Sequence, residues 1–198
     1  MRGVPIPELH EQLFAAAEQI MARDGVAGLT SRAITDEAGC AKGVLHNHFD
    51  GLDGFLAEFA VDRVRRTEDA VSGLPAQAGH RAVSDNLVAA ALTVFSSGAT
   101  QVAALITARP ALAARVLAAL GPDGQPFGQV QAAFASYLRA EQELGRLPAT
   151  ADADTVAFTL IGAVHHLFFT AGGSEPDPDR VRGIVTTLLG DAHSQAGT

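Results

Sequence analysis

Residues 30–49 read TSRAITDEAGCAKGVLHNHF, and this stretch predicts two short helices joined by a tight turn. Thr30 can cap a helix over 31–38, because its hydroxyl can accept a hydrogen bond from a backbone N–H of the first turn. Gly39 supplies the backbone freedom that the turn requires, and a second helix follows over 42–48. The inward positions are expected to be Ala33, Ile34 and Ala38 in the first helix, Val44 or Leu45 in the second, and Phe49 at its end.

Two short helices joined by a glycine-containing turn are typical of a helix-turn-helix. In that motif the second helix enters the major groove of DNA, with its N-terminal half nearest the base edges. The same spacing also occurs in α-helical proteins that bind no DNA, where it is only a packing motif. The geometry alone therefore leaves both interpretations open.

The periodicity outside this stretch is helical as well. Apolar residues recur at three- and four-residue steps, and glycine- and proline-rich segments separate these runs. No segment alternates apolar and polar residues as a strand would, so the sequence predicts an all-α fold. We expect a helix-turn-helix module over 1–51 and a larger helical domain over 52–198. The expected helices are 8–24, 31–38, 42–48, 52–72, 81–97, 100–107, 110–119, 126–144, 152–171 and 177–190.

Composition excludes several classes of protein. The 198 residues are 47% hydrophobic and 18% charged, which excludes intrinsic disorder, and the single cysteine, Cys40, excludes an internal disulfide. The longest apolar stretch, 156–169, is interrupted by polar residues and falls short of the ~18 residues of a membrane span. Because no signal peptide is recognisable either, we expect a cytoplasmic protein without a membrane partner. The net charge of −8 argues against a protein that coats nucleic acid, but not against a small, oriented DNA contact.

The N-terminal sixty residues resemble the signature of the TetR family of transcriptional regulators. The resemblance implies a DNA-binding helix-turn-helix followed by a helical domain for effector binding and dimerisation. It runs in register through Leu13-Phe14-Ala15-Ala16-Ala17, Gly25, Leu29-Thr30-Ser31-Arg32-Ala33-Ile34, Glu37-Ala38-Gly39, Lys42-Gly43-Val44-Leu45 and His48-Phe49.

The resemblance also assigns roles to residues of the motif. Lys42 and Asn47 have the chemistry to reach guanine or adenine edges, and Val44 to touch a thymine methyl. Gly43 would let the backbone approach the DNA closely. The phosphate-anchoring positions fall on Thr30, Ser31 and Arg32, and the recognition helix falls on Ala41, Lys42, Gly43, Val44, His46, Asn47 and His48.

This sequence departs from the family pattern at three positions. Ala41 stands where the family commonly has serine or threonine, His46 where tyrosine is frequent, and Leu52 where lysine is frequent. Residues 28–66 contain five basic side chains and six acidic ones. We therefore expect a DNA surface with few ionic contacts and low non-specific affinity.

The segment 152–171 is apolar on nearly every face, which predicts a helix buried on all sides. Burial of this kind usually needs a partner subunit in so small a domain, and the resemblance implies a four-helix dimer interface. The alternative is the central core helix of a monomer. The expected interface residues are Leu160, Val164, Leu167, Val181, Val185 and Leu188.

The C-terminal domain has more apolar bulk than packing alone requires, so we expect a cavity for a small apolar effector. Arg109 could pair with an acidic effector or lie at the surface. His165 and His166 point about a hundred degrees apart on a helix and have no ligand three or four residues away, so no metal or other cofactor is predicted. The expected lining residues are Phe59, Phe95, Phe134, Tyr137, His165, His166 and Phe168.

Together these features predict a homodimeric, ligand-responsive DNA-binding regulator, a repressor of a palindromic operator. The sequence has no nucleophile motif, phosphate loop or dinucleotide fingerprint, so no enzymatic activity is expected. The alternative function is that of a helical small-molecule-binding protein or enzyme that uses the C-terminal cavity without binding DNA.

Overall fold

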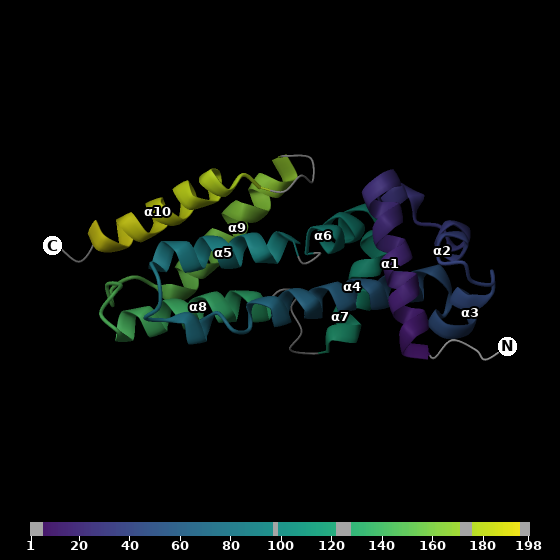
Figure 1. Cartoon of the computed structure of the whole chain (residues 1–198), viewed down its shortest axis with the longest axis horizontal. Coiled ribbons are helices and arrows are strands. Elements are labelled where there is room, and N and C mark those ends of the chain that lie inside the picture. The colour runs from purple at the N-terminus through teal and green to yellow at the C-terminus, as the bar shows by residue number, and fades with distance from the viewer. Residues whose placement is uncertain (1–5, 97–98, 122–127, 171–175, 195–198) are drawn as a thin grey trace. The chain divides into compact units, whose positions relative to one another are not determined.

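The computed structural model describes residues 6–96, 99–121, 128–170 and 176–194, and over these ranges every regular element is a helix (Figure 1). The all-α prediction is confirmed. Each expected helix is present, with ends displaced by about four residues at most, and two short 3₁₀-helices (η1 and η2) were not predicted. The elements are α1 (Ile6–Asp24), η1 (Val26–Gly28), α2 (Ser31–Glu37), α3 (Val44–Phe49), α4 (Gly51–Val71), η2 (Pro75–Gln77), α5 (Val83–Ser96), α6 (Ala99–Ala108), α7 (Pro110–Leu120), α8 (Gly128–Glu143), α9 (Ala153–Thr170) and α10 (Pro178–Ser194).

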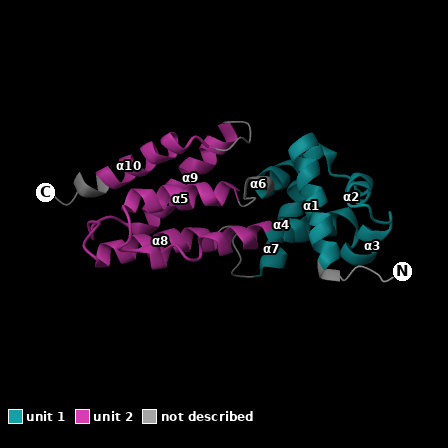
Figure 2. Cartoon of the chain, in the orientation of Figure 1, with its two compact units in different colours: residues 1–62, 101–123 teal, residues 63–100, 124–198 magenta. Residues whose placement is uncertain are grey.

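The chain divides into two compact units (Figure 2). Unit 1 comprises residues 1–62 and 101–123, and unit 2 comprises 63–100 and 124–198. The expected boundary at residue 51 therefore differs from the division by packing, which lies inside α4. The first half of α4 and the segment containing α6 and α7 fold together with the N-terminal helices.

Unit 1 has an aromatic core that explains this division. Phe55 and Phe59 lie on α4 and are fully buried, and both rings lie 5.6 Å from the ring of Phe14 on α1. Phe49, at the end of α3, meets Phe55 edge to face at 5.1 Å. Such ring pairs contribute beyond the area they bury, so the start of α4 is held by the N-terminal helices.

Unit 2 is built from the C-terminal part of α4, η2, α5, α8, α9 and α10. Helix α5 packs against α8 and α10, and α9 packs against α8 and α10. A continuous apolar core lies among these helices, and its larger fully buried members are Leu87, Val130, Phe134, Tyr137, Leu160, Val164, Val181 and Val185.

Helix α9 is long and apolar enough, by length and composition, to cross a membrane, with a mean hydropathy of 1.2 over its 18 residues. The sequence-based statement that no stretch reaches this length was therefore wrong. One face of α9, with Leu160, Val164 and Leu167, packs in the core of unit 2. Only 33% of the 18 residues are buried, so the prediction of a helix buried on all sides was wrong for the single chain.

Candidate nucleic-acid interface

Helix α2 begins as the sequence predicts. Thr30 has extended backbone angles (φ −122°, ψ 153°), and its hydroxyl oxygen accepts a hydrogen bond from the backbone N–H of Ala33 at 3.1 Å. Ile34 and Thr35 face the core, and the Thr35 hydroxyl donates to the backbone carbonyl of Ser31 at 3.0 Å. Because these inward residues fix the helix, Thr30, Ser31 and Arg32 are left exposed at its N-terminal end.

The turn after α2 is locked by hydrogen bonds. Gly39 has a φ of +65°, a conformation that favours glycine. The backbone N–H of Cys40 donates to the carbonyl of Thr35 at 2.9 Å, and the side-chain amide of Gln12 on α1 donates to the carbonyl of Ala38 at 2.6 Å. The pattern of the sequence predicted the turn but not the role of Gln12.

Helix α3 is shorter than predicted, because Lys42 and Gly43 belong to the turn that precedes it. Leu45 and Phe49 are its buried residues, so Leu45, and not Val44, is the inward position. Asp50 ends the helix in the left-handed conformation, with a φ of +57°. Six of the seven predicted recognition residues are consequently exposed, and Val44 is half-buried; the exposed ones are Ala41, Lys42, Gly43, His46, Asn47 and His48.

The charges around this surface are few. Lys42 makes no ion pair within the described residues, whereas the Nε atom of Arg32 lies 3.3 Å from Oδ2 of Asp36. Arg23 on α1 pairs with Glu37 at 3.1 Å and so neutralises one acidic group near the motif. The structure thus leaves Lys42 as the cation of the α3 turn that is available to a partner.

Two features of the scaffold escaped sequence reasoning. Arg109 lies between α6 and α7, and its Nη2 atom donates to the backbone carbonyl of Leu29 at 3.1 Å. The half-buried Arg109 side chain therefore contacts the residue that immediately precedes the helix-turn-helix. At Gly54 an added Cβ would lie 1.5 Å from the backbone oxygen of Phe49, so α4 can approach the end of α3 only with glycine there. Pro110 predicted a helix start after Arg109, but no sequence pattern links positions 80 residues apart.

The seven residues expected to line an effector cavity lie in three different places. Phe59 belongs to the aromatic core of unit 1. Phe134 and Tyr137 are fully buried in the core of unit 2. The half-buried rings of Phe95, His165 and Phe168 are neighbours, with centroids 6.0 to 6.5 Å apart, and His166 is exposed.

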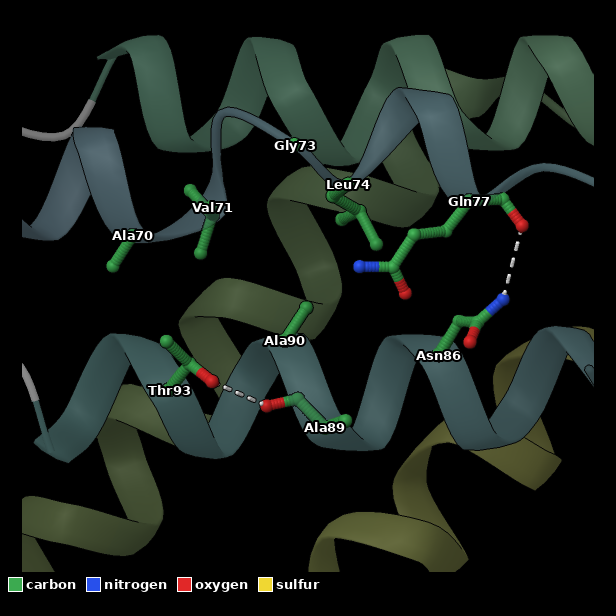
Figure 3. A pocket seen from close by; sticks show the side chains of 9 residues that line it. All are labelled: Ala70, Val71, Gly73, Leu74, Gln77, Asn86, Ala89, Ala90 and Thr93. Carbon is green, nitrogen blue, oxygen red and sulfur yellow. Dashed lines mark hydrogen bonds between the residues drawn. The ribbon is translucent and has the colours of Figure 1, made fainter. Parts of the chain in front are cut away.

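A cavity of about 110 Å³ lies elsewhere in unit 2, between the C-terminal end of α4, η2 and α5 (Figure 3). None of the seven expected residues lines it. Its walls are Ala70, Val71, Gly73, Leu74, Gln77, Asn86, Ala89, Ala90 and Thr93.

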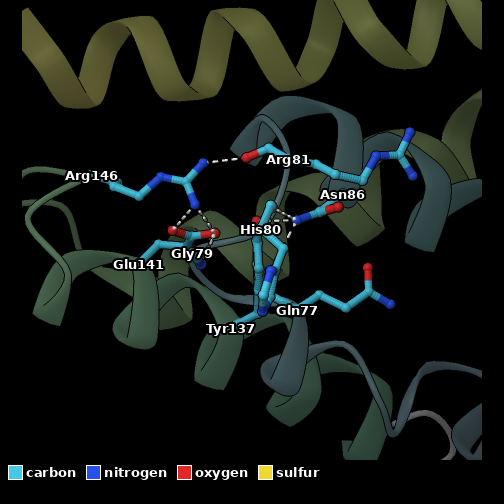
Figure 4. A network of polar contacts seen from close by, with 8 residues as sticks. All are labelled: Gln77, Gly79, His80, Arg81, Asn86, Tyr137, Glu141 and Arg146. Atoms are coloured by element: carbon cyan, nitrogen blue, oxygen red, sulfur yellow. Dashed lines mark hydrogen bonds and ion pairs between the residues drawn. The ribbon is translucent and has the colours of Figure 1, made fainter.

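A polar network shares Gln77 and Asn86 with the lining of this cavity (Figure 4). Glu141 on α8 is fully buried and pairs with the guanidinium of Arg146 at 3.1 Å. Its carboxylate also accepts from the backbone N–H of Gly79 at 3.3 Å. Burial, together with the Glu141 carboxylate, raises the pKa of Tyr137 well above its usual range, so its hydroxyl keeps its proton. The network ties the η2–α5 loop to α8.

The residues predicted for the dimer interface lie mainly inside unit 2. Five of them are buried in its own core, and Leu188 is half-buried. The outward face of α9 instead carries Phe158 and Phe169, which are 66% and 51% exposed. The apolar pattern of α9 could not distinguish these faces, because residues of both are hydrophobic. The five core residues are Leu160, Val164, Leu167, Val181 and Val185.

Metal-ligating residues do not cluster in the described parts of the chain: no group of three or more His, Cys, Asp or Glu could hold an ion there. Burial lowers the pKa of His165, which favours the neutral ring. His165 stacks on the ring of Phe169 at 5.4 Å, so its contacts are those of an aromatic packing residue.

Residues 13–59 match the family model described as bacterial regulatory proteins, tetR family. The match covers the end of α1 from residue 13, the whole of α2 and α3, and the start of α4. No protein with a curated description matches the chain.

Solved structures extend the likeness beyond this segment. A chain assigned to the TetR-family transcriptional regulators from Mesorhizobium loti has a TM-score of 0.74 and 15% identity, covering 98% of each chain. The fatty acid degradation regulator FadR from Bacillus halodurans has a TM-score of 0.68 and 17% identity, covering 96% of this chain and 97% of its own. PfmR from Thermus thermophilus, a TetR-family regulator, has a TM-score of 0.64 and 12% identity, covering 89% of this chain and 96% of its own.

The fold and the exposed α3 turn thus define a helix-turn-helix protein of the all-α class. Residues 13–59 match the N-terminal domain of the tetR family, and the chain as a whole has the fold of the solved TetR-family regulators described above.

Proposed function

We propose that this protein is a homodimeric, ligand-responsive transcriptional regulator that acts in the cytoplasm as a repressor. The observation that carries the proposal is the set of exposed residues at the start of α2 and around α3, held by a closed core within the segment that matches the tetR-family model. Phosphate contacts from Thr30, Ser31 and Arg32 would set the register, and base contacts from Lys42 and Asn47 would read sequence.

A second copy of the chain would cover the outward face of α9. Phe158, Gly162, His166 and Phe169 follow one another at steps of four, four and three residues, and so share one face of the helix. Exposed aromatic rings of this size are unfavourable in water and mark interaction surfaces. A two-fold dimer calls for a palindromic operator with half-sites about one helical turn, or a multiple of it, apart.

An effector in unit 2 would act by preferring the conformation that does not fit the operator, since a ligand shifts an equilibrium only by its difference in affinity for the two states. The alternative function, a helical binding protein or enzyme without DNA, leaves the exposed α3 surface without a role.

The test is selection of DNA from a random library by the purified full chain. The expected result is enrichment of one inverted repeat that the protein retards in gels, while shuffled sequence of equal length is not retarded. Failure to enrich any sequence, with folded protein, would contradict the proposed function and favour the alternative.

A further inference from the structure

The cavity between α4, η2 and α5 has a buried floor and an exposed rim (Figure 3). Val71, Leu74 and Asn86 form the floor and are 2%, 2% and 1% exposed. Gln77 and Ala89 form the rim and are exposed to solvent. The cavity therefore opens outward and ends on apolar side chains with one amide among them.

The amide of Asn86 is held in one orientation. Its nitrogen donates to the backbone carbonyls of His80 at 2.8 Å and Gln77 at 3.4 Å, and to the hydroxyl oxygen of Tyr137 at 3.0 Å. Since all three partners accept, the nitrogen must face them. The oxygen Oδ1 is left buried and accepts no hydrogen bond within the described residues.

A buried acceptor of this kind is uncommon, because nearly all buried polar atoms are paired with protein, water or ligand. The Gln77 side chain reaches from the rim toward Leu74 and Ala90 and, being exposed, can move without disturbing the floor (Figure 3). Because Asn86 lines the cavity, a donor for this oxygen can enter through it.

The hydroxyl of Thr93, which also lines the cavity, favours a ligand that donates hydrogen bonds. The Thr93 hydroxyl gives its proton to the backbone carbonyl of Ala89 at 2.9 Å, so it offers only lone pairs to an occupant. No lining residue is charged. Apart from the movable side-chain amide of Gln77, the cavity presents acceptors and apolar surface, and its complement is a neutral molecule that donates hydrogen bonds.

We propose that this cavity binds the hydroxyl-bearing end of a small neutral molecule, whose O–H donates to Oδ1 of Asn86 as the Gln77 side chain moves aside. A dry cavity of about 150 Å³ encloses benzene, so this open cavity of about 110 Å³ takes only part of a ring-sized molecule and leaves the rest at the exposed rim. This molecule would be the effector of the regulator. That role rests on the proposed function, whereas binding of the molecule to the cavity does not.

The test compares phenol with toluene, which has nearly the same shape but no hydroxyl, by NMR titration of the ¹⁵N-labelled full chain. Phenol is expected to shift the side-chain amide of Asn86 and the backbone amides of Ala89 and Ala90 saturably, and to bind at least five-fold more tightly than toluene. Thr93→Val, which keeps the shape and removes an acceptor, should weaken phenol two- to five-fold.

Ala90→Leu places a larger side chain in the cavity and should weaken phenol binding at least ten-fold. Its matched control is Ala132→Leu, on an exposed position of α8 outside the lining, which should leave phenol binding unchanged. Absence of saturable shifts, equal affinities for phenol and toluene, or full phenol binding by folded Ala90→Leu would each overturn the proposal.

A parallel DNA-retardation assay separates this proposal from the proposed function. If phenol occupies the cavity and changes the protein's affinity for the selected DNA, the result supports both the cavity proposal and the proposed function. Occupancy that leaves DNA affinity within two-fold supports the binding site and overturns its effector role. A chain that binds no DNA contradicts the proposed function, while the NMR titration still decides the cavity.

Discussion

Arg109, between α6 and α7, donates a hydrogen bond from Nη2 to the backbone carbonyl of Leu29 at 3.1 Å. Leu29 immediately precedes Thr30, the residue that caps the first helix of the helix-turn-helix. The same guanidinium lies 3.7 Å from Asp53 in the first turn of α4. One side chain thus joins the α6–α7 connection to two of the elements that position the candidate DNA surface.

Replacing Arg109 by alanine is expected to lower the free energy of unfolding by ~1–3 kcal/mol, because it leaves a partly buried carbonyl unpaired. Affinity for all DNA sequences should fall together, since Thr30 would lose its fixed position. Arg115→Ala is the control: its pair with Asp50 is exposed and 3.9 Å long, so the loss should be about 0.5 kcal/mol or less. Equal denaturation midpoints for the two variants would contradict a special role for Arg109.

Base recognition is expected to depend on Lys42 and Asn47. Alanine at either position should weaken binding to the selected site by ~1–3 kcal/mol and relax sequence preference there. Arg32→Ala should instead weaken specific and non-specific DNA alike and reduce the slope of log K against log salt by about one. Fluorescence anisotropy over a salt series measures both quantities, and unchanged affinity in all three variants would place the DNA surface elsewhere.

Lys42 is the only lysine of the chain, so mild acetylation modifies this side chain and the N-terminal amine alone. Acetylation removes the charge and is expected to weaken DNA binding, while bound DNA should protect Lys42 from the reagent. Lys42→Arg, which keeps the charge and resists acetylation, is the control. Mass spectrometry measures the acetylation of Lys42 with and without bound DNA. Equal acetylation in the two samples would mean that DNA does not cover this residue.

Gly54 and Gly43 are expected to separate stability from DNA contact. A Cβ at Gly54 would lie 1.5 Å from the oxygen of Phe49, so Gly54→Ala must displace α3 or α4, and we expect a loss of ~2–4 kcal/mol of stability. At Gly43 the nearest atom is the side-chain nitrogen of Asn47 at 3.7 Å, an ordinary contact. Gly43→Ala should therefore keep the melting temperature and weaken only DNA binding. Thermal unfolding and anisotropy of both variants test this, and an unaffected melting temperature for Gly54→Ala would refute the close approach.

The outward face of α9 is expected to hold the dimer. Phe158→Glu should yield a folded monomer, because its side chain is 66% exposed in the single chain and a buried charge at the interface would be unpaired. Leu144→Glu, at an apolar residue that is 56% exposed after α8, should remain dimeric. Leu160→Glu should unfold unit 2 and not simply dissociate it, since Leu160 lies in the core. Light scattering reports the mass of each, and a monomeric unmutated chain at micromolar concentration would contradict the dimer.

The sequence by itself determined the helices and the helix-turn-helix. Thr30 as a cap and Gly39 in the turn are local devices, and hydrophobic periodicity marks each helix without knowledge of its neighbours. The exposed positions around α3 could be predicted for the same reason: once Leu45 or Val44 and Phe49 face inward, the remaining positions of so short a helix must face out.

Only the tertiary structure decided which face of α9 is inward, since Leu160 and Phe158 are both apolar and differ only in what surrounds them. It also decided the contacts of Arg109 with Leu29 and of Asn86 with Tyr137, which join residues 80 and 51 positions apart. No local pattern encodes such pairs, because they exist only after separate helices have packed. For the same reason the residues predicted to line a cavity do not line the one between α4, η2 and α5: Phe59, Phe134 and Tyr137 fill the cores of the two units, and the space left between helices depends on how those cores close.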